Sequence, residues 1–173
     1  MSDPDPGDPD PGEASPVRLA PVERDVATAL LAGRLPEQIA FAPGYPSSFS
    51  LQAMDLFAGR RSASGFMPSF VVREDDGRVV GEIGHSLDVQ YATATIGYSI
   101  AGSCEGRGYA TAAARILIAR LRADPAVRRI EARTLVANRA SRRVLEKAGM
   151  RLVAERLEEV DGVLARIVAY ELR

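Results

Sequence analysis

The stretch that decides the fold reads Gly102-Ser103-Cys104-Glu105-Gly106-Arg107-Gly108-Tyr109-Ala110-Thr111. It joins a strand pattern over residues 93–101 to the longest helical pattern of the chain, from Tyr109 to about Ala123. Gly106 and Gly108 let the backbone turn tightly, and the first turn of a helix has N–H groups without a partner inside the helix. Because the helix dipole favours negative charge there, the loop predicts a cradle for a pyrophosphate.

A loop with two such glycines has other interpretations. A simple tight turn before a helix would use the same residues. The chain has no Gly-Lys-Ser/Thr sequence, which argues against a P-loop nucleotide site. A dinucleotide-binding Gly-x-Gly-x-x-Gly loop would need glycine where Thr111 stands, and this strand-helix unit comes late in the chain for that fold.

Upstream of the loop, helical spacing gives way to strand patterns. Pro21 suits the first turn of a helix that continues through Val26 and Leu30, and Ser50 is placed to cap a second helix that ends near Gly59. The remaining upstream segments are strands at 17–19, 69–73 and 78–85, loops at 36–49 and 62–68, and a hairpin turn at 75–77.

Downstream, Asp124-Pro125 ends the long helix and a strand follows over residues 129–136. Asn138 is placed to cap a short helix that runs to Ala148, and Gly149 stands where a glycine commonly ends a helix. Residues 150–160 and 163–172 form a final hairpin that turns at Asp161-Gly162.

The element order β, α, α, β, β, β, α, β, α, β, β predicts one mixed α/β domain over residues 17–173. The unit 93–136 organises it. Residues 1–16, MSDPDPGDPDPGEASP, hold almost nothing apolar and are predicted to be a disordered acidic tail.

The composition is that of an ordinary globular protein, with 46% hydrophobic residues in 173. No apolar run approaches the roughly 20 residues that span a bilayer, and no secretory signal is recognisable. Cys104 is the single cysteine and His85 the single histidine, so neither an internal disulfide nor a Cys/His zinc site is expected. We therefore expect a bacterial cytoplasmic protein without a metal and without a membrane partner.

The net charge of −1 hides a local excess of positive charge. Residues 104–151 carry 12 Arg and Lys against 4 acidic residues, whereas residues 1–15 carry five acidic and no basic ones. This excess indicates an anionic partner for that stretch, and a solvated basic face is the alternative.

Three stretches resemble the GNAT N-acetyltransferases: Ile96-Gly97-Tyr98-Ser99-Ile100, residues 106–111, and residues 138–149. The branch that they resemble most contains the RimJ/RimL-type enzymes, which acetylate protein N-termini and small amines. The likeness covers about residues 68–172. It implies a central, mostly antiparallel sheet that splays around a β-α-β acetyl-CoA site and is flanked by helices, with residues 17–67 shaping the acceptor pocket.

The resemblance implies acetyl-CoA as co-substrate. Its pantetheine arm would lie in the gap between the strands 93–101 and 129–136 and bond to the backbone of Ser99, Ile100 and Ala101. Its pyrophosphate would lie on Gly106, Arg107, Gly108, Tyr109, Ala110 and Thr111. Glu105 stands where the family has Gln or Arg. We expect this carboxylate to face solvent, while Arg107 and the backbone N–H groups bind the phosphates.

Acetyl transfer to an amine needs a polarised thioester carbonyl, a proton for the leaving thiolate and a neutral amine. By family position, the N–H of Ile100 would polarise the carbonyl. Asn138 would bond the pantetheine and Ser141 would protonate the thiolate. The alternatives are that Asn138 is only a helix cap and Ser141 only an exposed helix residue. Many relatives use Tyr for the acid step, and no Tyr lies in this helix.

The general base is open between several groups. Glu82, on the strand next to 93–101, would accept the ammonium proton directly or through water. His85 has a suitable pKa but lies on the opposite face of that strand by alternation. Tyr98 and a water relay without a dedicated base are the other candidates. A covalent acetyl intermediate on Cys104 is disfavoured, because no His lies near it in the sequence.

The leading hypothesis is thus direct acetyl transfer to a primary amine, on a protein N-terminus or on a small molecule. A non-catalytic acetyl-CoA sensor or interaction module on the same fold is the first alternative. Nucleic-acid binding through the arginines is disfavoured, because no aromatic residues are interleaved with them. A homodimer remains open.

Overall fold

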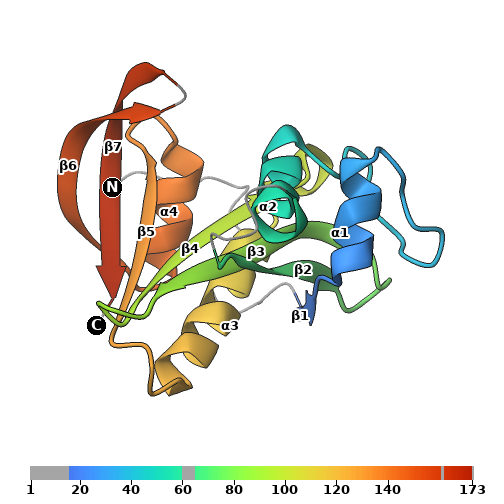
Figure 1. Cartoon of the computed structure of the whole chain (residues 1–173), viewed down its shortest axis with the longest axis horizontal. Coiled ribbons are helices and arrows are strands. Elements are labelled where there is room, and N and C mark those ends of the chain that lie inside the picture. The colour runs from blue at the N-terminus through green and yellow to red at the C-terminus, as the bar shows by residue number, and fades with distance from the viewer. Residues whose placement is uncertain (1–15, 60–64, 161, 173) are drawn as a thin grey trace, which may run out of the picture.

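A computed structural model describes residues 16–59, 65–160 and 162–172. Within these residues seven strands form one sheet, in the order β1-β2-β3-β4-β5-β7-β6 (Figure 1). All neighbouring strands are antiparallel except β4 and β5, which are parallel. The strands are β1 Val17–Pro21, β2 Met67–Arg73, β3 Val79–Asp88, β4 Thr93–Ile100, β5 Arg129–Leu135, β6 Arg151–Val160 and β7 Val163–Leu172. The predicted mixed, mostly antiparallel sheet is confirmed.

The helices cover the two faces of this sheet. They are α1 Arg24–Leu31, α2 Ser48–Ala58, α3 Tyr109–Ala123 and α4 Arg139–Lys147, and a 3-10 turn at Gly102–Cys104 precedes α3. In Figure 1, α1 and α2 lie above the strands β2 to β4 and α3 lies below them. The element order follows the predicted one throughout.

The core forms where α3 packs against β1, β3 and β4. The apolar face of α3 that its helical spacing predicts is buried, including Ala113, Leu117 and Leu121. Ile83 of β3 and Ile96 of β4 are buried too, with 0% and 4% of their surfaces exposed. Burial of each such aliphatic side chain contributes about 1.5–3 kcal/mol, so this contact holds the start of α3 firmly at the end of β4.

Two expected helix starts are wrong. Pro21 ends strand β1 and pairs with Ser69 of β2, and α1 begins only at Arg24. Proline is tolerated there because β1 is an edge strand, where a missing N–H leaves no ladder partner unsatisfied. The cap of α2 is Ser47 rather than Ser50. Ser50 is the third residue of the helix and completes a reciprocal capping box with Ser47.

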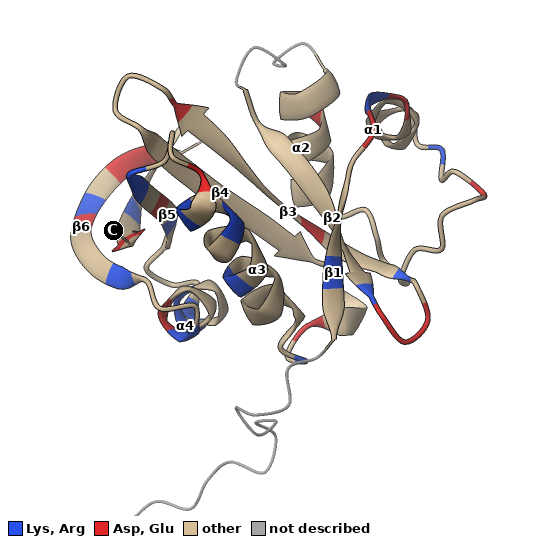
Figure 2. Cartoon of the chain, turned by 90° about the horizontal axis from the view of Figure 1, so that it is seen from below, with Lys and Arg blue, Asp and Glu red and all other residues tan. Residues whose placement is uncertain are grey.

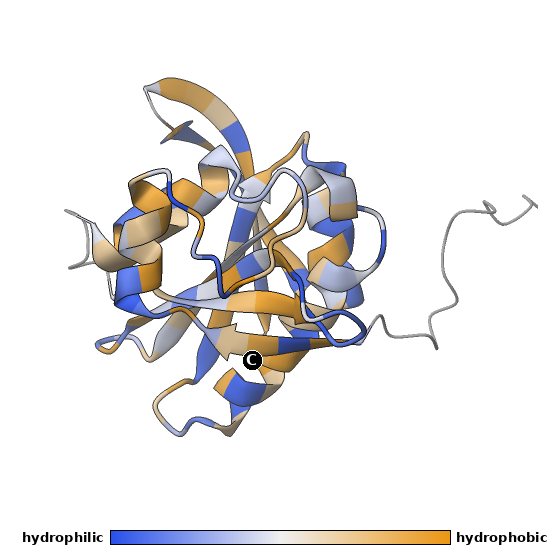
Figure 3. Ribbon diagram, turned by 90° about the vertical axis from the view of Figure 1, so that its right-hand side faces the viewer, coloured by the Kyte–Doolittle hydropathy of each residue, from blue (hydrophilic) through white to orange (hydrophobic). Residues whose placement is uncertain are grey.

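The hairpin of β6 and β7 extends beyond the rest of the sheet. Strand β5 pairs with β7 only over residues 167–172, so the outer part of the hairpin has no third strand beside it. Figure 3 shows its apolar tip standing clear of the rest of the chain. Residues 1–15 of the predicted tail, residues 62–64 of the predicted loop and Asp161 of the predicted turn lie outside the described residues.

Candidate active site

The glycine loop has the geometry that its sequence predicts. Gly106 and Gly108 have φ angles of 74° and 78°, in the left-handed region that favours glycine, and Gly108 is the N-cap of α3. The first hydrogen bond of the helix runs from the Ala112 N–H to the Gly108 carbonyl, at 3.0 Å. The N–H groups of Tyr109, Ala110 and Thr111 precede this bond, so they are oriented toward an anion at the helix N-terminus.

Neighbouring segments fix this loop from both sides. The Ser103 hydroxyl donates to the Pro43 carbonyl at 2.7 Å, and Cys104 is buried. Tyr109 is also buried, and the Arg73 guanidinium of β2 lies 5.9 Å from the centre of its ring. Glu105 is exposed, as its departure from the family pattern led us to expect.

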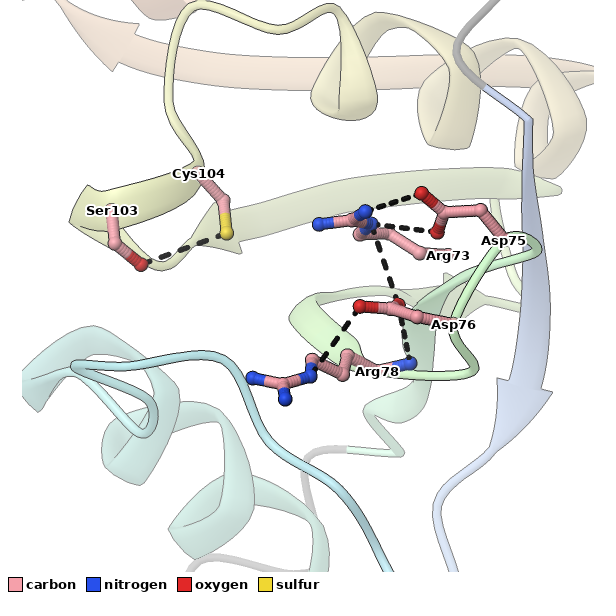
Figure 4. Close-up of polar contacts among 6 residues, drawn as sticks. All are labelled: Arg73, Asp75, Asp76, Arg78, Ser103 and Cys104. Atoms are coloured by element: carbon pink, nitrogen blue, oxygen red, sulfur yellow. Dashed lines mark hydrogen bonds and ion pairs between the residues drawn. The ribbon is translucent and has the colours of Figure 1, made fainter.

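Arg73 is itself held by the hairpin that joins β2 to β3 (Figure 4). Its guanidinium forms ion pairs with Asp75 and Asp76, and Asp76 also pairs with Arg78 at 3.4 Å. The Asp75 carboxylate raises the pKa of Arg73, and the guanidinium in turn lowers the pKa of Asp75. No local pattern pointed to Arg73 as a support of the glycine loop, because the two are more than thirty residues apart in the sequence.

Strands β4 and β5 separate beside this loop. Their parallel pairing ends at Ile96 and Ala132, and in Figure 1 the two strands diverge beyond that point. The Ala101 N–H donates to the Val80 carbonyl of β3 at 2.8 Å. Because backbone groups alternate in an antiparallel pair, the N–H of Ile100 points away from β3, into the gap. The gap therefore offers a backbone donor at the residue that the resemblance names for it, whereas the N–H of Ala101 is engaged within the sheet.

The start of α4 lies on one side of β4. The Asn138 side chain accepts a hydrogen bond from the Ser141 N–H at 3.0 Å, so its role as a helix cap is confirmed. The Ser141 hydroxyl lies 2.9 Å from the Tyr98 hydroxyl of β4, and Tyr98 also donates to the Ser141 carbonyl at 3.0 Å. Burial raises the pKa of Tyr98 to about 12, which keeps this phenol protonated at neutral pH.

Tyr98 therefore stands beside Ser141 as a neutral hydroxyl, rather than as a base. No tyrosine lies within α4, but Tyr98 reaches the start of this helix from a strand 43 residues away. Helix α4 is further held by the Tyr170 hydroxyl of β7, which donates to Glu146 at 2.7 Å and accepts from Arg142 at 3.3 Å. These contacts fix the position of Ser141.

The other face of β4 adjoins a buried carboxylate. Glu82 of β3 stands in register between Phe70 of β2 and Ser99 of β4, so the three side chains share the face that α2 covers. Only 1% of Glu82 is exposed. Burial raises its pKa to about 7, while the nearby hydroxyls of Ser50 and Tyr45 act in the opposite direction. Burial and the charge of Glu82 likewise raise the pKa of Tyr45.

Three serines link this carboxylate to β4. The Ser47 hydroxyl lies 3.0 Å from the Ser50 hydroxyl and 3.2 Å from the Ser99 hydroxyl. Ser50 is buried, whereas Ser47 and Ser99 are half-buried. Next along the same face of β4 is Gly97, and a Cβ atom added there would meet nothing within 4 Å. The sequence alone did not place Ser47, Ser50 or Tyr45 near Glu82.

His85 does not join this cluster. It faces the opposite side of β3, as the alternation predicts, and is half-buried there. Burial lowers its pKa, and Asp124 raises it to a smaller extent. The surface also has a hollow of about 500 Å³ in the predicted acceptor region, lined by α1 and residues 34–38. None of the described candidate site residues lines it.

The described residues bear on two further expectations. Among them, no group of three or more His, Cys, Asp or Glu side chains is arranged to hold a metal ion. No helix in the described part of the chain is long and apolar enough to cross a membrane.

The arrangement was compared with known proteins. The family described as Acetyltransferase (GNAT) domain matches residues 17–151. A search of curated proteins finds no significant match. A crystal structure of a probable acetyltransferase superposes with a TM-score of 0.64 at 26% identity, over 90% of this chain and 92% of the other.

Two further structures resemble the fold at lower identity. RimL, a ribosomal alpha-N-protein acetyltransferase in complex with coenzyme A, gives a TM-score of 0.65 at 18% identity, over 92% of this chain and 97% of that one. A chimera of the spermidine N-acetyltransferase SpeG from Vibrio cholerae with hSSAT gives a TM-score of 0.66 at 16% identity, over 90% of this chain and 94% of that one. The family match over residues 17–151, on a sheet that opens between β4 and β5, means that the chain belongs to the GNAT acetyltransferase family.

Proposed function

We propose that the chain transfers the acetyl group of acetyl-CoA directly to a primary amine, on a small molecule or on a protein N-terminus. One observation carries this proposal. On one face of β4, the hydroxyl of Tyr98 lies beside that of Ser141. On the other face, Ser99 lies beside the carboxylate of Glu82. At the next residue of the strand, the N–H of Ile100 points into the gap. An acid, a base and a polarising donor therefore meet at one place.

The residues around the gap fit a coenzyme A molecule. The N–H groups at the start of α3 would hold its pyrophosphate, with Arg107 beside them. Figure 2 shows Lys and Arg on α3, α4, β5 and β6, which supports an anionic ligand on this side of the chain. The described backbone near Ser99 and Ile100 would lie along the pantetheine arm. RimL was solved in complex with coenzyme A, which supports the same ligand for this fold.

The proposed division of labour follows from the two faces of β4. Acetyl-CoA supplies the activated acetyl group when bound. The Ile100 N–H donates to the carbonyl oxygen of that group and withdraws charge from it. Ser141, backed by Tyr98, supplies a proton on the α4 side, and Glu82 takes up the amine proton on the α2 side. Because the carboxylate of Glu82 is buried, it reaches the amine through intervening groups rather than by direct contact.

The acceptor is proposed by class. The fold neighbours include one acetyltransferase of spermidine and one of a ribosomal protein. Both small-molecule amines and protein N-termini should therefore be tested as acceptors. We expect residues 17–173 to act as one acetyltransferase domain, with residues 1–16 as a tail. A reducing cytoplasm suits the single cysteine.

The decisive experiment is an amine panel with detection of the released thiol. It should include spermidine, an aminoglycoside, free amino acids and short peptides with a free N-terminus, each with a control that lacks the amine. We expect thiol release that depends on one class of amine, with the acetylated product confirmed by mass spectrometry. Tight coenzyme A binding without turnover on any amine would instead identify the sensor function.

A further inference from the structure

The buried carboxylate of Glu82 has an unusual environment. Neither of its oxygens has a partner at hydrogen-bond geometry among the described residues, and the same holds for the Tyr45 hydroxyl beside it. Buried polar groups are rarely left in this condition, because the loss of hydration costs free energy that no bond returns. A carboxylate retained in such a place indicates a function beyond stability.

A row of three hydroxyls leads from the surroundings of this carboxylate to the edge of the gap. The Ser50 hydroxyl is near enough to lower the pKa of Glu82, although it is not at hydrogen-bond geometry with either carboxylate oxygen. Ser47 lies 3.0 Å beyond Ser50, and Ser99 on β4 lies 3.2 Å beyond Ser47. Exposure increases along the row from buried Ser50 to half-buried Ser47 and Ser99. The row therefore joins a buried proton acceptor to the strand where the acetyl group would lie.

The backbone of α2 orients two of these hydroxyls. The Ser47 N–H donates to the Ser50 Oγ at 3.2 Å, and the Ser50 N–H donates to the Ser47 Oγ at 3.1 Å. Each oxygen thus already accepts one hydrogen bond from the backbone. Its own proton remains to be donated along the row, and an oxygen held in this way has a fixed lone-pair direction.

We propose that Ser99, Ser47 and Ser50 form a hydroxyl relay that carries a proton from the acceptor amine to Glu82. This relay rests on the proposed acetyl transfer and specifies how its buried base is reached. The three serines are positioning residues for that base. A capping box alone would need Ser47 and Ser50 but not Ser99, which lies 52 residues away in the sequence.

The proton balance of the relay is simple. The amine gives one proton to the Ser99 Oγ, and the proton of Ser99 moves to the Ser47 Oγ. The proton of Ser47 then moves to the Ser50 Oγ, and that of Ser50 to an oxygen of Glu82. Each serine ends with one proton, as it began, and the carboxylate becomes a carboxylic acid.

The titratable groups around the relay are few among the described residues. Tyr45 is the titratable group that affects the pKa of Glu82. Its own pKa is raised, so the phenol stays protonated near pH 7. Asp124 raises the pKa of His85, and His85 lies on the opposite face of β3 from Glu82. If kcat/KM rises with pH near 7, we therefore assign that rise to the deprotonation of Glu82.

The test compares Ser99→Ala and Ser50→Ala with Ser99→Thr, which keeps a hydroxyl at the end of the row. On an acceptor found in the amine panel, we expect each Ala variant to lower kcat/KM about 100-fold, the lower end of general-base assistance. Their rise of kcat/KM with pH near 7 should flatten. Ser99→Thr should stay within about threefold of the parent, because threonine suits a strand and retains the hydroxyl.

Two controls separate the relay from a structural effect. Ser86→Ala changes a half-buried serine four residues from Glu82 on the same strand and should leave kcat/KM and its pH profile unchanged. Thermal unfolding measured by circular dichroism should show Ser99→Ala folded like the parent. In a double variant, Ser99→Ala should add no further loss to Glu82→Gln, because both changes interrupt one path.

The outcomes are distinguishable. A parent that acetylates no amine overturns the proposed function, and the relay with it. An active parent whose Ser99→Ala variant keeps the parental rate and pH profile overturns the relay alone. Additive losses in the double variant would also overturn it. An infrared titration of the Glu82 carboxyl gives a reading that needs no acceptor, because Ser50→Ala should raise its pKa, and an unmoved pKa contradicts the link.

Discussion

The two sides of the gap between β4 and β5 are built in different ways. The glycine loop is exposed and works through backbone N–H groups at a helix start, all within residues 106–111. The Glu82 cluster beneath α2 is buried and works through side chains from β3, β4 and the segment before α2. One side needs the right backbone conformation, and the other needs several distant residues to meet.

This difference separates two kinds of sensitivity. Changes in the glycine loop should act on acetyl-CoA affinity, because any contact there exists before the reaction begins. Changes around Glu82 and Ser141 should act on turnover, because proton transfers belong to the transition state. The buried side also stores a stability cost, since an ionised carboxylate is held away from water.

The largest effect is expected for Glu82→Gln. Loss of the base should lower kcat/KM about 10²–10⁴-fold and remove the rise with pH near 7. The same change should stabilise the fold at pH 8. The pKa of Glu82 is raised to about 7 in the folded chain from an ordinary value of 4.5, so folding stability falls as pH rises between these values.

Glutamine has no such charge to bury, so unfolding free energy at pH 8 should increase by up to about 3 kcal/mol. Chemical denaturation at pH 5 and pH 8 measures this gain, which should fall to about 1 kcal/mol at pH 5. An active and less stable Glu82→Gln variant would contradict both the base assignment and the buried charge.

The second effect concerns the acid on the α4 face. Ser141→Ala should lower kcat about 10²-fold with acetyl-CoA affinity nearly intact, because the hydroxyl acts mainly as the thiolate leaves. Tyr98→Phe should give a smaller loss, since it removes the hydroxyl that lies beside Ser141 but leaves the serine in place. Steady-state kinetics on the true acceptor measures both.

Asn138→Ala is the matched comparison on the same helical turn. It removes a cap worth about 1 kcal/mol, so stability and acetyl-CoA affinity should fall together. If Ser141→Ala turns over at the parental rate, the acid is Tyr98 or solvent, and the Tyr98→Phe result decides between them.

A third, intermediate effect is expected for Gly108→Val. A valine at a φ of 78° is strained and places a branched side chain where the N–H groups of α3 face the ligand. The KM for acetyl-CoA should rise at least about tenfold with little change in kcat, because contacts of this kind are made equally in the ground and transition states.

Gly33→Val is the control for backbone strain. Its φ is 71°, and a Cβ there meets nothing within 4 Å, but it follows α1 far from the glycine loop. It should lose similar stability and keep the parental KM for acetyl-CoA. An unchanged KM in a folded Gly108→Val variant would refute the placement of the pyrophosphate.

The smallest effect is expected for Glu105→Gln. Because Glu105 is exposed, its charge is screened by water and salt, and its removal should tighten acetyl-CoA by less than about threefold without changing kcat. Isothermal titration at low and at physiological salt measures this gain, which should shrink as salt is added. A large fall in kcat would mean that this carboxylate takes part in the chemistry.

The sequence by itself determined the local structure, including the conformation of the glycine loop. The order of elements, the bounds of α3 and the N-cap of α4 follow from short-range rules, because hydrophobic periodicity and capping depend on residues within a few positions. Gly106 and Gly108 announce their left-handed backbone in the same way. Two helix starts were exceptions. Pro21 pairs as a strand residue instead of opening a helix, and Ser50 completes a capping box whose N-cap is Ser47.

Only the tertiary structure decided which side chains meet. Tyr98 reaches Ser141 across 43 residues, Arg73 reaches Tyr109 from another strand, and Ser47 reaches Ser99 across 52. Strand register and helix packing set these contacts, and neither can be read from local spacing. The pKa of Glu82 also depends on the tertiary structure. Burial under α2 raises it, and burial is a property of the whole fold rather than of the neighbouring residues in the sequence.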